Sequence, residues 1–356
     1  MIPMKNKVQK NTINPYGAVG EISSIDDFYF QWHITERCNQ RCSHCYHDKY
    51  LGERELDETA LLEVATQMLA AVEKWGRIAS FSLTGGEPFL RQQELFSIAN
   101  LLDDRSVVGY YDILTNGSLI DVESLAKLTR LKKLRRVQLS LEGASPETND
   151  MVRGRGSFAS TLDAIQRLKN AKLVVSVMTT VTRVNAHEIP ALIDLLEGRG
   201  VDALALERFV PEGQGKNMLD KALTKEETKD VFKTIHRAGR LPRPLRMLMY
   251  RPLFCLLDQD DSTVGARCSV GTNALTVMHD GTVFPCRRLP IPLGNILHDG
   301  LYKIWYDSPV LWAIRNPKNL KGKCGRCDLV SLCRGCRAVA YAHSGDYLAE
   351  DPQCWA

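Results

Sequence analysis

Three cysteines lie within eight residues near the start of the chain: Cys38, Cys42 and Cys45, with Tyr46 directly after them. Thiolates are preferred ligands of soft metal centres such as zinc and iron–sulfur clusters. Three thiolates so close in the chain can hold one centre from one side, which leaves a further ligand position open. An outside molecule can bind and react at such a position, so this segment predicts a reactive metal site.

The other eight of the 11 cysteines lie in the last third of the chain. They are Cys255, Cys268, Cys286, Cys324, Cys327, Cys333, Cys336 and Cys354. The odd total, and residues 1–20 without an apolar core segment, argue against a secreted protein held by disulfides. Clustered thiols in a reducing compartment fit metal chemistry better, so we expect a cytoplasmic protein.

The composition of the chain limits the classes of partner that we expect it to bind. The chain has 356 residues, of which 44% are apolar, and a net charge of +4. It contains no long basic block, so we expect no nucleic-acid partner. Its most apolar helical stretch, 61–72, is interrupted by Glu63, Thr66 and Gln67. We therefore expect no transmembrane helix and no membrane partner.

From residue 28 to residue 239, short runs rich in β-branched and aromatic residues alternate with longer segments of helical periodicity. The expected strands are 28–34, 78–83, 111–114, 136–141, 173–181 and 203–209. Asp57 and Thr224 are expected to cap two of the helices. Strand–helix alternation implies parallel strands joined by right-handed crossovers. Six such units are two short of a closed eight-stranded barrel. We predict an α/β fold with a partial (β/α)6 TIM-type barrel, and a doubly wound sheet is the alternative.

The pattern changes after the last of these helices. Residues 240–251 contain two prolines and four arginines, which is typical of a linker. The segment beyond it is dense in cysteine and contains short strands around the turn His279-Asp280-Gly281. We predict an N-terminal extension at 1–27, a barrel domain at 28–240, a linker at 241–254 and a small cysteine-rich domain at 255–356.

Polar motifs follow the predicted strands, at the end where an α/β barrel carries its active site. They are Gly85-Gly86-Glu87-Pro88, Thr115-Asn116-Gly117 and Ser140-Leu141-Glu142-Gly143, with Arg153-Gly154 further on. Behind the C-x3-C-x2-C run and its aromatic neighbour, this order of motifs resembles the radical S-adenosylmethionine (SAM) superfamily. The resemblance covers about 28–239.

The resemblance implies a [4Fe–4S] cluster on Cys38, Cys42 and Cys45, with SAM bound at its open iron. The residues it implies as SAM contacts are Tyr46, Gly85, Gly86, Glu87, Asn116, Ser140, Arg153 and Thr180. Family members cleave SAM reductively to a 5′-deoxyadenosyl radical, which takes a hydrogen atom from the substrate. An electron donor such as flavodoxin or ferredoxin is therefore implied. No general acid–base pair is visible, so further catalytic residues stay unassigned.

The C-terminal spacing Cys324-x2-Cys327-x5-Cys333-x2-Cys336, followed by Asp351-Pro352-x-Cys354, resembles the SPASM domain. The resemblance implies two auxiliary [4Fe–4S] clusters, and so three clusters in all. By position, one would be held by Cys255, Cys268, Cys286 and Cys336, and the other by Cys324, Cys327, Cys333 and Cys354. Spacing alone does not decide this partition. If Cys255 is not a ligand, the first of the two clusters has an open iron.

Zinc is the alternative metal in both regions. His44 or His47 could complete a zinc site in the first motif, and Cys324, Cys327, Cys333 and Cys336 could form a zinc ribbon. The chain would then be a non-catalytic scaffold that binds a partner.

The substrate follows from the SPASM resemblance. Most such enzymes crosslink, oxidise or decarboxylate a ribosomally made peptide or protein, and we expect that here. The alternative is a related branch that decarboxylates tetrapyrrole propionates in haem biosynthesis. Since about 27 residues are too few for a fused leader-binding domain, a peptide substrate would need a separate leader-binding protein or would dock directly. Sulfatase maturases have an acidic residue where Arg287 stands, so that activity is not expected. Six arginines could pair with an acidic leader or with propionates: Arg240, Arg243, Arg246, Arg251, Arg287 and Arg288.

Overall fold

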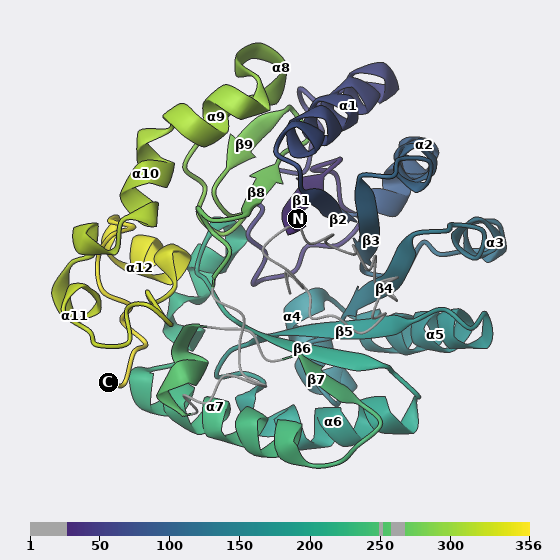
Figure 1. Cartoon of the computed structure of the whole chain (residues 1–356). Helices are drawn as coiled ribbons and strands as arrows, with labels where there is room; N and C mark the ends of the chain where they lie inside the picture. The colour runs from purple at the N-terminus through teal and green to yellow at the C-terminus, as the bar shows by residue number, and fades with distance from the viewer. Residues whose placement is uncertain (1–26, 249–251, 258–267) are drawn as a thin grey trace, which may run out of the picture.

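The computed structural model describes residues 27–248, 252–257 and 268–356. Its centre is a single ten-stranded sheet in the order β10-β9-β8-β1-β2-β3-β4-β5-β6-β7 (Figure 1). The strands are β1 Asp27–His33, β2 Ile78–Thr84, β3 Val108–Thr115, β4 Leu134–Ser140, β5 Val175–Val181, β6 Ala203–Arg208, β7 Arg246–Leu248, β8 Ala274–Val277, β9 Thr282–Phe284 and β10 Gly294–Asn295. All six strands predicted from the sequence are present.

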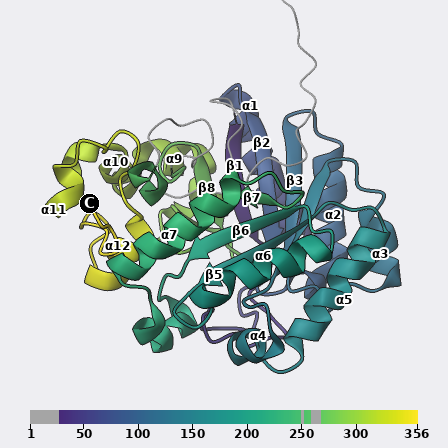
Figure 2. The same ribbon diagram turned by 90° about the horizontal axis from the view of Figure 1, so that it is seen from below.

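Strands β1 to β7 are parallel and form a curved sheet with helices on its outer side (Figure 1). These helices are α1 Glu58–Lys74, α2 Gln92–Asp103, α3 Val122–Leu128, α5 Ser157–Asn170, α6 Ile189–Gly198 and α7 Lys225–Arg240. Helix α4 Pro146–Arg153 lies instead at one end of the barrel (Figure 2). The sheet ends at β7 on one side and at β10 on the other, so it does not close. The predicted partial barrel is confirmed, and the doubly wound alternative is wrong.

Alternation along each strand explains why the sheet curves around a cavity. In β1, Phe28, Phe30 and Trp32 are fully buried in the apolar core. Tyr29 and Gln31 point to the other face, where they line a cavity. Because successive side chains of a strand point to opposite faces, one face packs under helices and the other supplies polar groups to the barrel interior.

Two helix starts follow the capping signals of the sequence. The Asp57 side chain accepts a hydrogen bond from the Ala60 N–H at the start of α1. At the start of α7, Thr224 and Glu227 form the reciprocal capping box. Short polar side chains satisfy N–H groups that have no partner inside the helix, which is why these positions are readable from the sequence.

The cysteine-rich segment is joined to the barrel more closely than a separate domain would be. Strand β8 pairs in parallel with β1, so both regions share one sheet. Strand β7 lies inside the predicted linker and pairs with β6. The segment continues with η4 Pro252–Leu256, α8 Ile296–Asp299, α9 Leu301–Asp307, α10 Pro309–Arg315, η5 Pro317–Asn319, α11 Gly322–Gly325 and α12 Arg337–Ser344. The remaining 3-10 turns are η1 Pro88–Arg91, η2 Ala186–Glu188 and η3 Gly213–Lys221.

Figure 2 shows the C-terminal helices beside α7, at one side of the barrel. Phe232 of α7 contacts Trp355 at 5.4 Å between ring centroids, and the Gln353 side chain donates to the Leu223 carbonyl. The end of the chain therefore packs on the barrel wall. Within the described ranges, no helix combines the length and apolar content needed to cross a bilayer.

Candidate active site

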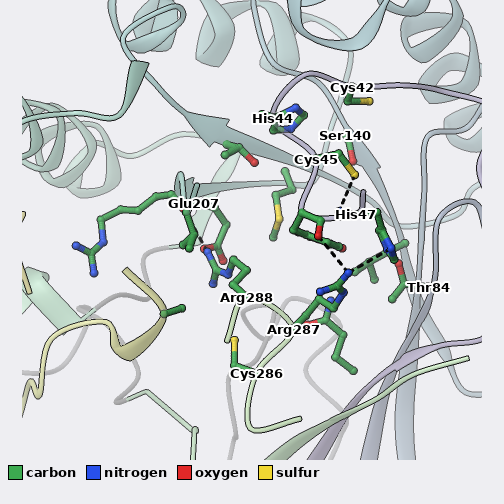
Figure 3. Close-up of a pocket in the computed structure, with 18 of the residues that line it drawn as sticks. Cys42, His44, Cys45, His47, Thr84, Ser140, Glu207, Cys286, Arg287 and Arg288 are labelled. Carbon is green, nitrogen blue, oxygen red and sulfur yellow. Dashed lines mark hydrogen bonds and ion pairs between the residues drawn. The ribbon is translucent and has the colours of Figure 1, made fainter. Parts of the chain in front are cut away.

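The three cysteines of the first motif lie in the irregular loop that follows β1. Cys38, Cys42 and Cys45 are free thiols and line one cavity of about 310 Å³ at the carboxyl end of the barrel strands (Figure 3). The backbone N–H groups of Gln40 and His47 donate to the sulfurs of Cys38 and Cys45, at 3.4 Å in each case. The loop therefore offers three sulfur donors to one space.

Burial controls the protonation of these thiols. It raises the pKa of Cys38 to about 11, and it raises the pKa of Cys42 although the Arg153 guanidinium opposes the shift. Cys38 and Cys42 are therefore neutral at pH 7 unless a cationic centre stabilises their thiolates, as metal binding does. This donor set fits a cluster held by three thiolates.

Gly85 and Gly86 pack closely against the backbone that leads into the cysteine loop. The Gly86 N–H donates to the Thr35 carbonyl at 2.9 Å. A Cβ atom on Gly85 would lie 2.5 Å from the Thr35 carbonyl oxygen, and one on Gly86 would collide with the Arg37 carbonyl. Only glycine allows the two backbones to approach so closely, directly before Cys38. Gly85 and Gly86 also line the cavity.

Glu87 does not line the cavity, although the sequence analysis expected it to contact SAM. Its carboxylate is fully buried and accepts from the Thr115 hydroxyl at 2.7 Å and the Asn116 N–H at 2.8 Å. The Asn116 side chain in turn donates to Asn39 in the cysteine loop. Glu87 therefore positions Asn116 and holds the end of β3, and any effect on a bound cofactor is indirect.

Glu142, which had no assigned role, joins the first motif to the barrel. Its Oε1 accepts from Arg153 at 3.0 Å and contacts His44 Nε2 at 3.1 Å. Its Oε2 accepts from the Thr180 N–H at 2.7 Å. Burial favours the neutral acid, but His44 and Arg153 hold the pKa of Glu142 below its ordinary value. Arg153 also donates to the Gln40 side chain, so one charged network fixes the cysteine loop.

Seven of the eight predicted SAM contacts line the same cavity. They are Tyr46, Gly85, Gly86, Asn116, Ser140, Arg153 and Thr180. They come from the cysteine loop, from the ends of β2 to β5 and from α4. The chain thus brings together residues that are far apart in sequence, because parallel strands end at one edge.

Three cysteines of the C-terminal region line this cavity as well. They are Cys268, Cys286 and Cys336, at its C-terminal wall. Figure 3 shows Cys286 on the side of the cavity opposite Cys42 and Cys45. Two sets of three cysteines therefore face one space.

Cys255 lies elsewhere. Its thiol donates to the Pro252 carbonyl at 3.1 Å, and Cys333, Cys327 and Cys354 are close enough to influence its pKa. Cys324 and Cys354 likewise lie within electrostatic reach of Cys333. The structure therefore groups Cys255 with the other cysteine set, in contrast to the partition carried over from the SPASM resemblance.

A buried ion pair links the barrel to both C-terminal cysteine sets. Arg208, the last residue of β6, pairs with Asp351 at 2.9 Å, and both side chains are nearly inaccessible. Asp351 also accepts from the Cys336 N–H at 2.7 Å, and its own N–H donates to the Cys324 sulfur. Arg208 was not among the site residues predicted from the sequence. Its place at the end of a predicted strand was the available signal.

The two arginines that follow Cys286 both line the cavity, but they have different partners. Arg288 donates to the Glu207 carboxylate of β6 at 2.6 Å. The Arg287 guanidinium lies 4.5 Å from the centre of the Tyr46 ring and contacts the Tyr46 carbonyl and His47 Nδ1 (Figure 3). Both were candidates for pairing with an anion, and only Arg288 has a carboxylate partner among the described residues.

Zinc was the alternative metal in both cysteine regions. In the described parts of the chain, no three or more His, Cys, Asp or Glu residues are arranged around a single-ion position. His44 is instead held by Glu142.

Comparison with known families agrees with this geometry. The family model of the Radical SAM superfamily matches residues 32–196, and that of SPASM, an iron–sulfur cluster-binding domain, matches residues 268–337. AdoMet-dependent heme synthase of Methanosarcina barkeri is 32% identical, over 91% of this chain and 95% of that protein. Fe-coproporphyrin III synthase of the same organism is 27% identical, over 91% of this chain and 86% of that protein. Mycofactocin maturase MftC of Mycolicibacterium smegmatis is 28% identical, over 91% and 81% respectively.

Among solved structures, Streptococcus suis SuiB bound to its precursor peptide SuiA shares the fold, with a TM-score of 0.73 and 15% identity. The match covers 93% of this chain and 76% of SuiB. The predicted cofactors, SAM and iron–sulfur clusters, are those of the two matched families. The scaffold alternative is set aside, because the homologues are synthases and maturases. The chain belongs to the radical SAM superfamily and is a radical SAM enzyme with a C-terminal SPASM domain.

Proposed function

We propose that the protein acts on an iron tetrapyrrole and decarboxylates its propionate side chains. The observation that carries this proposal is the similarity to AdoMet-dependent heme synthase, at 32% identity over 343 residues. It spans both the barrel and the cysteine-rich region of this chain. The peptide substrate that the sequence analysis preferred becomes the second candidate.

The chemistry balances as an oxidative decarboxylation. The propionate loses one hydrogen atom, from the carbon attached to the ring, to the 5′-deoxyadenosyl radical that SAM cleavage supplies. The bond to the carboxylate then breaks, so that carbon dioxide leaves, a vinyl group forms and one electron is released. When bound, iron–sulfur clusters would supply the electron that cleaves SAM and accept the electron released from the substrate.

The residues of the chain have three tasks in this proposal. Cys38, Cys42 and Cys45 would hold the SAM-binding cluster, and Cys268, Cys286 and Cys336 an auxiliary one. The SAM contacts would be Tyr46, Gly85, Gly86, Asn116, Ser140, Arg153 and Thr180, with Glu87 and Glu142 as positioning residues. Side chains from both regions line the cavity, which would keep water away from a radical.

The proposed reaction also implies an electron donor and a cellular location. Reduction of the first cluster needs a one-electron donor of the flavodoxin or ferredoxin class. A cytoplasmic location fits, because thiol ligands persist in a reducing compartment.

Peptide modification is the second candidate. The 28% identity to mycofactocin maturase MftC over 91% of the chain favours it. A peptide substrate with a separate leader-binding protein belongs to this alternative only.

The test uses the full chain, purified and reconstituted with iron and sulfide without oxygen. It is incubated with SAM, dithionite and Fe-coproporphyrin III, and the products are analysed by mass spectrometry. We expect 5′-deoxyadenosine together with porphyrin products that have each lost carbon dioxide and two hydrogens per converted propionate. A matched reaction without SAM is the control.

Formation of 5′-deoxyadenosine with no change in the porphyrin, and no binding of the porphyrin, would overturn the substrate class. The family assignment would stand in that case. Modification of a co-expressed peptide would then favour the second candidate.

A further inference from the structure

Arg287 is a buried cation in the wall of the cavity. Its exposed fraction is 7%, and its Nε has no hydrogen-bond partner among the described residues. Its guanidinium stacks on Tyr46, and one terminal nitrogen contacts the Tyr46 carbonyl and His47 Nδ1. These partners carry no formal negative charge.

Among the other arginines that line the cavity, the buried Arg153 and Arg208 and the half-buried Arg288 have carboxylate partners, whereas the buried Arg337 donates to the Tyr347 and Ala349 carbonyls. Arg153 pairs with Glu142 at 3.0 Å, Arg208 with Asp351 at 2.9 Å and Arg288 with Glu207 at 2.6 Å. No ion pair of Arg287 with a carboxylate occurs among residues 27–248, 252–257 and 268–356. Burying a charge without an opposite charge is costly, so such a group is expected to receive an anionic partner from a ligand.

Its position narrows the choice of ligand. Arg287 follows Cys286 directly and contacts the backbone of Tyr46, which follows Cys45. It therefore stands between the two cysteine sets that face the cavity (Figure 3). A planar guanidinium with unused N–H groups matches the geometry of a carboxylate.

We propose that Arg287 binds a carboxylate of the substrate and so positions the substrate between the two cysteine sets. This rests on the proposed function, in which the carboxylate is a propionate of the iron tetrapyrrole. The carboxylate of SAM is the other possible source. The proposed SAM contacts Ser140, Arg153 and Thr180 lie on β4, α4 and β5, whereas Arg287 belongs to the C-terminal region. Arg287 also stacks on Tyr46, a further proposed SAM contact, but it directly follows Cys286 of the C-terminal cysteine set, and this position favours the substrate.

The test compares wild type, Arg287→Gln and Arg287→Lys as full-length, cluster-reconstituted proteins without oxygen. Fe-coproporphyrin III is titrated by absorbance to obtain the dissociation constant. We expect Arg287→Gln to weaken binding by about tenfold to a hundredfold, as for the loss of a hydrogen bond to a charged group. Arg287→Lys should fall between the two, since it keeps the charge and loses the planar fork.

Arg315→Gln is the matched control. The Arg315 guanidinium also stacks on an aromatic ring, Trp305 at 4.3 Å, and donates to the Gly271 and Trp305 carbonyls. It does not line the cavity. Its substitution should leave porphyrin affinity unchanged.

A second probe separates the carboxylate contact from general damage to the site. The tetramethyl ester of Fe-coproporphyrin III has no free carboxylate, so wild type and Arg287→Gln should bind it equally. Iron content per chain and the KM for SAM in porphyrin-free cleavage should also be equal in both proteins.

Three results would overturn the inference. One is unchanged affinity for Fe-coproporphyrin III in Arg287→Gln. Another is a raised KM for SAM with unchanged porphyrin affinity, which would assign Arg287 to SAM. The third is a loss of iron with equal loss of affinity for acid and ester, which would make Arg287 a counter-charge to the clusters. Failure of wild type to bind the porphyrin at all would instead count against the proposed function.

Discussion

The two cysteine regions reach one cavity by different routes. In the first, Cys38, Cys42 and Cys45 lie on one loop after β1, and local backbone geometry largely sets their positions. In the second, Cys268, Cys286 and Cys336 come from three separate segments that meet through strand β8, the loops around β9 and the start of α12. A local ligand set can be recognised from spacing, whereas a distributed set depends on the whole fold.

The difference extends to the supporting residues. The first region is held by Glu142, Arg153 and the Gly-Gly pair, all at strand or helix ends of the barrel. The second is held by the Arg208–Asp351 pair, which joins residues 143 positions apart. Substitutions in the first region should therefore affect SAM cleavage, and those in the second should affect later steps or docking of the C-terminal region.

The largest expected effect is the loss of SAM cleavage when Cys38, Cys42 and Cys45 are all replaced by alanine. The variant should form no 5′-deoxyadenosine and should keep about eight of about twelve irons per chain, because the other clusters have their own ligands. Product analysis and iron content check this. Persistent cleavage would show that the first region is not the SAM site.

A single substitution in the first region, Gly86→Ala, should also reduce SAM cleavage and iron content. In Gly86→Ala the new Cβ would meet the Arg37 carbonyl, which is backbone and cannot turn away. We expect displacement of the cysteine loop, loss of about four irons and at least about a tenfold fall in 5′-deoxyadenosine formation. Gly198→Ala is the control, because nothing lies within 4 Å of a Cβ at that position. Equal behaviour of both variants would contradict the role given to Gly86.

The second region is tested by single cysteine substitutions. Cys268→Ala should remove about four irons per chain and block product while porphyrin-free SAM cleavage continues. Cys255→Ala should keep about twelve irons, because Cys324, Cys327, Cys333 and Cys354 already supply four thiolates. The iron and sulfide content of each variant shows whether the replaced cysteine is a cluster ligand. A loss of four irons in Cys255→Ala would restore the partition carried over from the SPASM resemblance.

The smallest effect concerns the link between the regions. Arg208→Gln leaves the buried Asp351 carboxylate without its cation, which should cost about 3–5 kcal/mol and lower the midpoint of thermal unfolding. Arg183→Gln removes an exposed pair with Glu227, whose side chains are 41% and 42% accessible, and should cost about 0–1 kcal/mol. If the two variants unfold at the same temperature, the Arg208 pair does not stabilise the contact between barrel and C-terminal region.

Much of the barrel could be predicted from the sequence. The six expected strands lie at β1 to β6, and Asp57 and Thr224 cap α1 and α7 as expected. Strand β7 was not predicted, since three residues after two prolines carry no period that could indicate a strand. It forms because β6 offers a free edge to pair with.

Side-chain roles were less readable than element positions. Glu87 was expected at the cofactor, yet its carboxylate turns inward to Thr115 and Asn116. Arg287 was considered only as one of several arginines that could meet an acid. Its burial and its lack of a carboxylate partner in the described chain depend on contacts with Tyr46 and His47, which lie 240 or more positions away.

The sequence by itself determined the reactive end of this protein. Cys38, Cys42 and Cys45, with the motifs that end the following strands, identify a radical SAM site because their spacing is local and parallel strands end together. Only the tertiary structure decided which C-terminal cysteines share the cavity, where Cys255 lies and that Arg287 is buried without an acid. These are relations between segments distant in the chain, and folding alone brings them within contact distance.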